Sequence, residues 1–197
     1  MGTLLTSALL LTAGALTPGP NNLLMLRIGL ERGTRAALLP ASGVVLGGVL
    51  MLLAAAAGTT SLLAVLPGVR GALVGGGELF VAWLGVRLIS SAGAPAANAP
   101  QRLRTSGLSM LLLQFVNPKS WVLVLTLTAA AAGGASAPSL GALTVLFVVI
   151  PFGCLVLWAA GGALAARVLQ EPRARAWFER AMGLTLLLCA LLLLVAE

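Results

Sequence analysis

Long apolar stretches alternate with short polar connections along the whole chain. Crossing about 30 Å of membrane hydrocarbon takes roughly 20 mostly apolar residues in a helix. Six stretches meet this length: 4–26, 37–57, 71–91, 108–132, 140–164 and 178–196. The pattern predicts an all-α protein with six transmembrane helices. The first stretch has no positively charged segment before it, so we expect a retained span rather than a cleaved signal peptide.

The composition places this pattern in a membrane. Of all residues 59% are hydrophobic and 9% are charged, and the mean hydropathy is +1.07. A soluble chain has roughly a quarter of its residues charged. The twelve basic residues outnumber the five acidic ones, but they lie between apolar runs rather than on one soluble face. We therefore expect membrane lipid around the protein and no nucleic-acid partner.

The positive charges also predict the topology. The first, third and fifth connections (27–36, 92–107 and 165–177) hold most of the arginines, whereas the fourth connection has no charge. Basic connections stay in the cytoplasm. The prediction is a multi-pass protein of the bacterial cytoplasmic membrane with both termini outside.

The middle of the chain suggests two halves. Residues 92–107 are rich in Ala and Pro and are typical of a cytoplasmic linker. Residues 1–91 and 108–197 then form two three-helix units, and the second unit enters the membrane from the opposite side. This is the topology of an inverted repeat, which is common in transporters. The first and fourth predicted spans are each interrupted by proline and asparagine.

The interruption of the first span is Pro18, Gly19, Pro20, Asn21 and Asn22. Proline removes a backbone donor, so carbonyl groups near residues 14–17 need new partners. One interpretation is a kinked helix packed by its neighbours. The other is a discontinuous helix that restarts near Pro20 and offers free N–H groups to a substrate carboxylate. In that case we expect residues 17–22 to be non-helical and to line a polar cavity.

The fourth span carries Gln114, Asn117, Pro118 and Lys119, with the lysine near the middle of the membrane. A lysine at that depth costs roughly 2.5–3.5 kcal/mol even on lenient scales. Either it belongs to a structural ion pair or it lies on a substrate pathway. Glu78 has the opposite charge at a similar depth of the third span, so a pairing of the two is the first hypothesis. Glu78 is also the candidate for carrying a coupling proton.

Other chemistry is sparse. Neither a nucleophile with a base nor a phosphate-binding loop stands out, so we expect no enzyme and no cofactor. Cys154 and Cys189 lie apart within apolar runs and the chain has no histidine, so no metal site is expected. Glycine pairs such as Gly43 and Gly47 allow close helix contact, either inside the fold or in a homodimer.

Three stretches resemble the LysE/RhtB family of bacterial amino-acid exporters: TPGPNNLLMLRIGLERGTRAAL at 17–38, AWLGVRLI at 82–89 and FVNPKSW at 115–121. The resemblance implies efflux of small amino acids, driven by the proton or potential gradient. It also implies binding roles for Pro18 to Asn21 and for Asn117 to Lys119. The chain departs from the family where many members have Asp in place of Asn21, and in having Glu78.

The predicted function is export of small amino acids or their derivatives. The carboxylate of a zwitterionic substrate would meet the second half of the first span or Lys119. Two alternatives remain open: a metal-ion exporter, although the spans offer few ligands for divalent metals, and a non-transporting membrane scaffold. A scaffold would have its two breaks packed dry, without a polar cavity.

Overall fold

The computed structural model describes residues 2–59, 67–90, 92, 106–131 and 138–195, and all regular structure within them is helical. The first half holds α1 (Gly2–Leu16), α2 (Pro20–Arg32), the 3₁₀ turn η1 (Thr34–Ala37), α3 (Leu38–Ala54), the π-helical turn η2 (Ala55–Thr59) and α5 (Pro67–Ser90). The second half holds α6 (Gly107–Val116), α7 (Pro118–Ala131), α8 (Leu140–Val168) and α9 (Pro172–Val195). The prediction of an all-α protein is confirmed.

The predicted spans coincide with helices, but several edges were wrong. α2 continues to Arg32 and α8 to Val168, beyond the expected ends at residues 26 and 164, and α9 begins earlier, at Pro172. Charged residues extend a helix where its end leaves the hydrocarbon, so hydropathy alone places the edge too early. Most of the predicted linker (93–105) and the connection at 132–137 lie outside the described residues.

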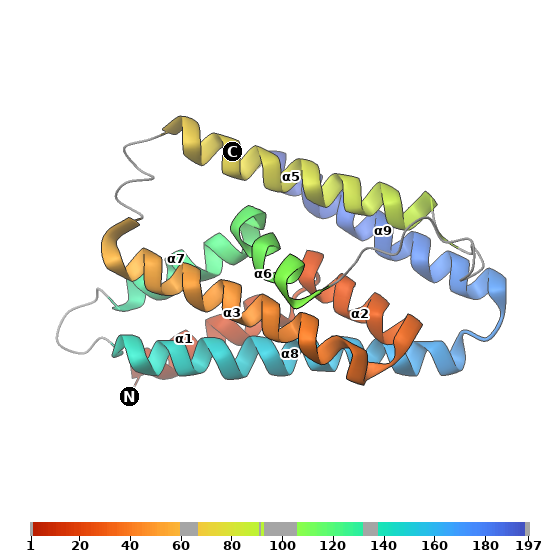
Figure 1. Ribbon diagram of the computed structural model, residues 1–197, viewed down its shortest axis with the longest axis horizontal. Helices are drawn as coiled ribbons and strands as arrows, with labels where there is room; N and C mark the ends of the chain where they lie inside the picture. Colours follow the sequence, from red (N-terminus) through yellow and green to blue (C-terminus); the bar gives the residue numbers. More distant parts are fainter. Residues whose placement is uncertain (1, 60–66, 91, 93–105, 132–137, 196–197) are drawn as a thin grey trace.

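Two helices of the described chain are long and apolar enough to cross a membrane, namely Thr34–Gly58 and Leu140–Val168. A third span is added when the bent pair α6 and α7 is taken as one. The six-span inverted repeat therefore stays a prediction. α1 begins and α9 ends at the same end of the molecule (Figure 1). The far end holds the C-terminal ends of α2, α5 and α8 and the start of α9, the elements that carry most of the described arginines.

Helices of the two halves pack against each other. α2 contacts α8, α3 contacts α6, and α5 contacts α9, with α5 and α9 lying side by side along one edge of the molecule (Figure 1). Several of these contacts depend on glycine. A Cβ at Gly29 would lie 1.9 Å from the carbonyl oxygen of Ala159, and a Cβ at Gly43 would lie 2.0 Å from that of Gly107. The expectation that Gly43 allows close packing inside the fold is confirmed, and a homodimer stays a prediction.

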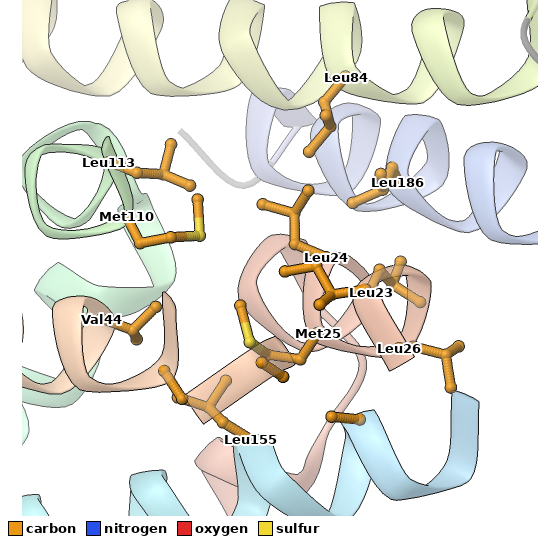
Figure 2. Packing of buried hydrophobic residues seen from close by; sticks show 14 of the residues in the cluster. Leu23, Leu24, Met25, Leu26, Val44, Leu84, Met110, Leu113, Leu155 and Leu186 are labelled. Atoms are coloured by element: carbon orange, nitrogen blue, oxygen red, sulfur yellow. The ribbon is translucent and has the colours of Figure 1, made fainter. Parts of the chain in front are cut away.

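α2 lies at the centre of the larger hydrophobic core. Leu23 to Leu26 and Ile28 to Leu30 are all buried, so the helix has apolar contacts around its circumference, as expected for a helix without a solvent-facing side. Figure 2 shows its leucines pointing to different neighbours, with Leu24 toward Leu84 and Leu186, and Leu26 toward α8. This packing fixes the start of α2, where the functional residues gather.

Candidate functional site

The first break separates α1 from α2 at Thr17, Pro18 and Gly19. The discontinuous helix restarts at Pro20, as one of the two interpretations predicted. The expectation that Pro20, Asn21 and Asn22 are non-helical was wrong, because these residues form the first turn of α2. Proline suits the first position of a helix, where its fixed φ fits and no hydrogen bond is lost.

The carbonyl groups freed at the end of α1 find new partners. The Asn22 Nδ2 atom donates to the carbonyl oxygens of Ala15 and Thr17, both at 2.7 Å. The Lys119 Nζ atom donates to the same carbonyl oxygen of Thr17 at 2.5 Å. The hydroxyl of Thr17 donates to the carbonyl oxygen of Gly14 at 2.8 Å. A cation at the C-terminal end of a helix is also favoured by the helix dipole. The lysine therefore has a polar partner inside the protein.

The second break lies at Asn117, where α6 and α7 meet at an angle of 72°. Asn117 is extended, as the residue before a proline tends to be. Its Oδ1 atom accepts a hydrogen bond from the backbone N–H of Lys119 at 3.2 Å, and its carbonyl oxygen accepts one from Ser120 at 3.0 Å. The residue thus ends one helix and caps the next.

Side-chain amides connect the two breaks. Asn21 Nδ2 donates to Gln114 Oε1 at 2.9 Å, and Gln114 Nε2 donates back to Asn21 Oδ1 at 3.3 Å. The hydroxyl of Ser120 donates to the same Gln114 oxygen at 2.7 Å. Gln114 is buried, and its remaining amide hydrogen reaches the carbonyl oxygen of Met110 at 2.8 Å. The pair fixes the start of α2 against the end of α6.

A cavity of about 50 Å³ opens between the breaks, with room for a few water molecules. Six of the predicted site residues line it: Gly19, Asn21, Asn22, Gln114, Asn117 and Lys119. Pro18, Pro20 and Pro118 are not among the lining residues and shape the breaks instead. The sequence analysis missed Ser120, which is marked only by being polar beside Lys119, and the cavity wall on α8 formed by Phe147, Pro151 and Leu155.

The cavity is rich in hydrogen-bond donors. Asn117 Nδ2 is buried and has no hydrogen-bond partner among the residues that the structure describes. Its assignment as a donor follows from the other amide atom, which must be an oxygen because it accepts from a backbone N–H. No side chain caps the start of α2, and the N–H groups of Asn21 and Asn22 have no partner within the described chain. Together with Lys119 they form an arrangement that suits an anionic group, and among the described residues no acidic side chain lines the cavity.

Glu78 lies elsewhere. It is buried on α5, its Oε1 atom has no hydrogen-bond partner within the described chain, and it is not among the residues that line the cavity. The hypothesis that Glu78 pairs with Lys119 was wrong: among the described residues no ion pair joins them, and the ammonium group binds the carbonyl of Thr17. A coupling role for Glu78 stays a prediction.

Comparisons with known proteins identify the family of this chain. A model of the LysE type translocator family matches residues 12–197. A leucine efflux protein from Enterobacter sp. (strain 638) is 29% identical over 109 residues, which cover 53% of this chain and 52% of that protein. The match thus spans about half the length of this curated relative. No solved structure matches the chain.

Proposed function

Because this chain belongs to the LysE type translocator family, we propose that it exports a small amino acid or amino-acid derivative across the bacterial cytoplasmic membrane. The observation that carries the proposal is the donor-lined cavity where the two helix breaks meet. The similar leucine efflux protein supports an amino acid as the substrate. Binding at a break between half-helices is also how several other transporter folds hold their substrates.

The substrate carboxylate binds the donors of the cavity. The free N–H groups of Asn21 and Asn22 lie at the positive end of the α2 dipole, which favours a negative charge. Asn117 Nδ2 supplies a buried donor that has no partner in the described part of the chain. Lys119 adds a positive charge beside Gly19, where the absence of a side chain leaves room: a Cβ there would lie 3.0 Å from the Lys119 Nζ atom.

The two alternatives have less support. A metal-ion exporter needs anionic or imidazole ligands, whereas this cavity holds a lysine and unpaired N–H donors that repel cations. A non-transporting scaffold would pack its breaks dry, and the polar cavity between Gly19 and Asn117 argues against that. Chemistry on the substrate has no support either, because the hydroxyl of Ser120 in the cavity wall donates to the amide oxygen of Gln114, which is not a base, rather than to Lys119.

The proposal includes the predicted topology, with both termini outside and the basic connections in the cytoplasm. The arginine-bearing ends of α2, α8 and α9 then face the cytoplasm together. A cysteine introduced at Gln170, which is exposed between α8 and α9, should resist an impermeant thiol reagent in intact cells. One introduced at Ser136 should react. The reverse labelling would overturn the orientation.

Efflux measurement tests the function. Cells with and without the protein are loaded with a panel of labelled amino acids, and we expect faster loss of at least one of them when the protein is present. Asn117→Asp is the matched variant, because it keeps the oxygen that caps Lys119 and replaces the free donor by an anionic acceptor. It should abolish the efflux at unchanged protein level. Equal retention of every amino acid with and without the protein would refute the proposed function.

A further inference from the structure

The wall of the cavity on α8 contains an unusual backbone position. Pro151 lies inside this 29-residue helix, is buried, and lines the cavity with Phe147 one turn earlier. Proline has no N–H group, so the carbonyl oxygen of Phe147 lacks the donor that residue 151 of a regular helix would provide. At membrane depth such an oxygen is tolerated when it faces protein or a polar cavity.

The opposite wall has the complementary chemistry. It presents the unpaired donors of α2 and Asn117 and the ammonium group of Lys119. No carboxylate of the described ranges lines the cavity, so a positively charged group on the substrate would have neutral oxygens to bind there. A backbone carbonyl without its helical partner is a strong acceptor of this kind.

We propose that the carbonyl oxygen of Phe147 accepts a hydrogen bond from the α-ammonium group of the substrate, and that Pro151 keeps this oxygen free. The inference rests on the proposed export function and adds an acceptor for the ammonium group, which an amino acid carries on the same carbon as its carboxylate. A cavity of about 50 Å³ whose lining residues include Asn117 and Lys119 as well as Phe147 and Pro151 fits such a compact head group. A plain carboxylic acid would use only the donor wall.

A pair of backbone variants isolates the carbonyl group. Pro151→Ala restores an N–H that can bond to the Phe147 oxygen. Lactic acid at position 151 has the same methyl side chain as alanine but joins the backbone through an ester, which has no N–H. The carbonyl oxygen of Phe147 therefore stays free in this variant. Pro172→Ala is the control for replacing a helix proline. Pro172 is the first residue of α9, where an N–H group has no carbonyl partner within the helix, so the replacement closes no hydrogen bond. Binding of leucine and of 4-methylpentanoate, which is leucine without its amino group, is measured on the full-length protein in nanodiscs.

We expect Pro151→Ala to weaken leucine binding about tenfold to hundredfold, the range for one hydrogen bond to a charged group. The ratio of leucine affinity to 4-methylpentanoate affinity should fall by the same factor in Pro151→Ala, and the ester variant should bind leucine at least about tenfold more tightly than Pro151→Ala does. Pro172→Ala should bind leucine as the wild type does. Equal leucine binding by the alanine and ester variants, whether normal or weakened, would overturn the inference while leaving export intact. A wild-type protein that binds no amino acid would refute export and this inference together.

Discussion

The two broken helices differ in how their second halves begin. At the start of α7, the side chain of Asn117 accepts from the N–H of Lys119 and its carbonyl accepts from Ser120. At the start of α2, Gly19 provides no side-chain cap. A helix N-terminus attracts an anion only while its N–H groups are free. We therefore expect the anion to bind at the first break, with Asn117 Nδ2 and Lys119 of the second break in a supporting role.

The two breaks are alike in what holds them in place. α2 is packed on α8 through glycine, and α6 is packed on α3 through glycine. In an inverted repeat, α1 corresponds to α6, α3 to α8, and α5 to α9. The α1–α8 contact is then equivalent to the α6–α3 contact, and the α5–α9 contact is equivalent to itself. All three contacts are present. An inverted repeat predicts this pattern. The contacts are compatible with such a repeat, which stays a prediction, and the chemistry of the two breaks differs.

Removing the first break should have the largest effect. The double substitution Pro18→Ala and Pro20→Ala allows α1 and α2 to join, which closes the free N–H groups of α2. We expect efflux to fall to the background of cells without the protein, at normal membrane abundance. Pro118→Ala should reduce efflux much less, because Asn117 still caps α7. Wild-type efflux by the double variant would show that the break is incidental.

The next effect concerns Lys119. Lys119→Met removes a charged donor from the cavity, and we expect substrate affinity to fall about tenfold to hundredfold. Thermal stability should change little, because the Thr17 carbonyl keeps its bond from Asn22. Since Glu78 has no ion pair with this lysine, Glu78→Gln should not restore transport to the variant. Recovery of stability in the double variant would point to a charge pair after all.

Much of this comparison could be predicted from the sequence. Proline and glycine inside an apolar run mark a break, because the backbone loses a donor whatever surrounds it. The partners of the freed carbonyls could not be predicted, since Asn22 reaches back to Ala15 only once the chain has folded across the break. The Glu78–Lys119 pairing failed for a related reason. Equal depth in the membrane does not determine which side of a helix a residue occupies.

Packing of the broken helices gives a smaller effect, seen in stability. A methyl group at Gly29 would collide with the backbone of Ala159, so Gly29→Ala must separate α2 from α8. We expect a loss of about 1–3 kcal/mol in unfolding free energy, typical of overpacking. Gly153→Ala on α8 is the control, because nothing lies within 4 Å of its Cβ position. Equal thermal stability of the two variants would contradict the close α2–α8 contact.

The smallest effect should come from the amide bridge between the breaks. Asn21→Asp can donate to Gln114 only while the new carboxyl is protonated, whereas Asn21 donates at every pH. Efflux by the variant should therefore be closest to wild type at low pH and fall severalfold as the pH rises. Efflux by the wild type, measured over the same pH series, should not show this additional fall with rising pH. An unchanged profile would mean that the bridge does not control the cavity.

The packing of α2 on α8, α3 on α6 and α5 on α9 has a consequence for biosynthesis. When the ribosome has completed α5, none of these three helices yet has its main partner. Synthesis at roughly 5–20 residues per second leaves the first half waiting on the order of 5 to 20 seconds for the second. During that time the amide of Asn21 lacks Gln114 and the glycine surface of α2 lacks α8. The nascent first half is therefore the stage at which we expect membrane chaperones or proteases to act on this protein.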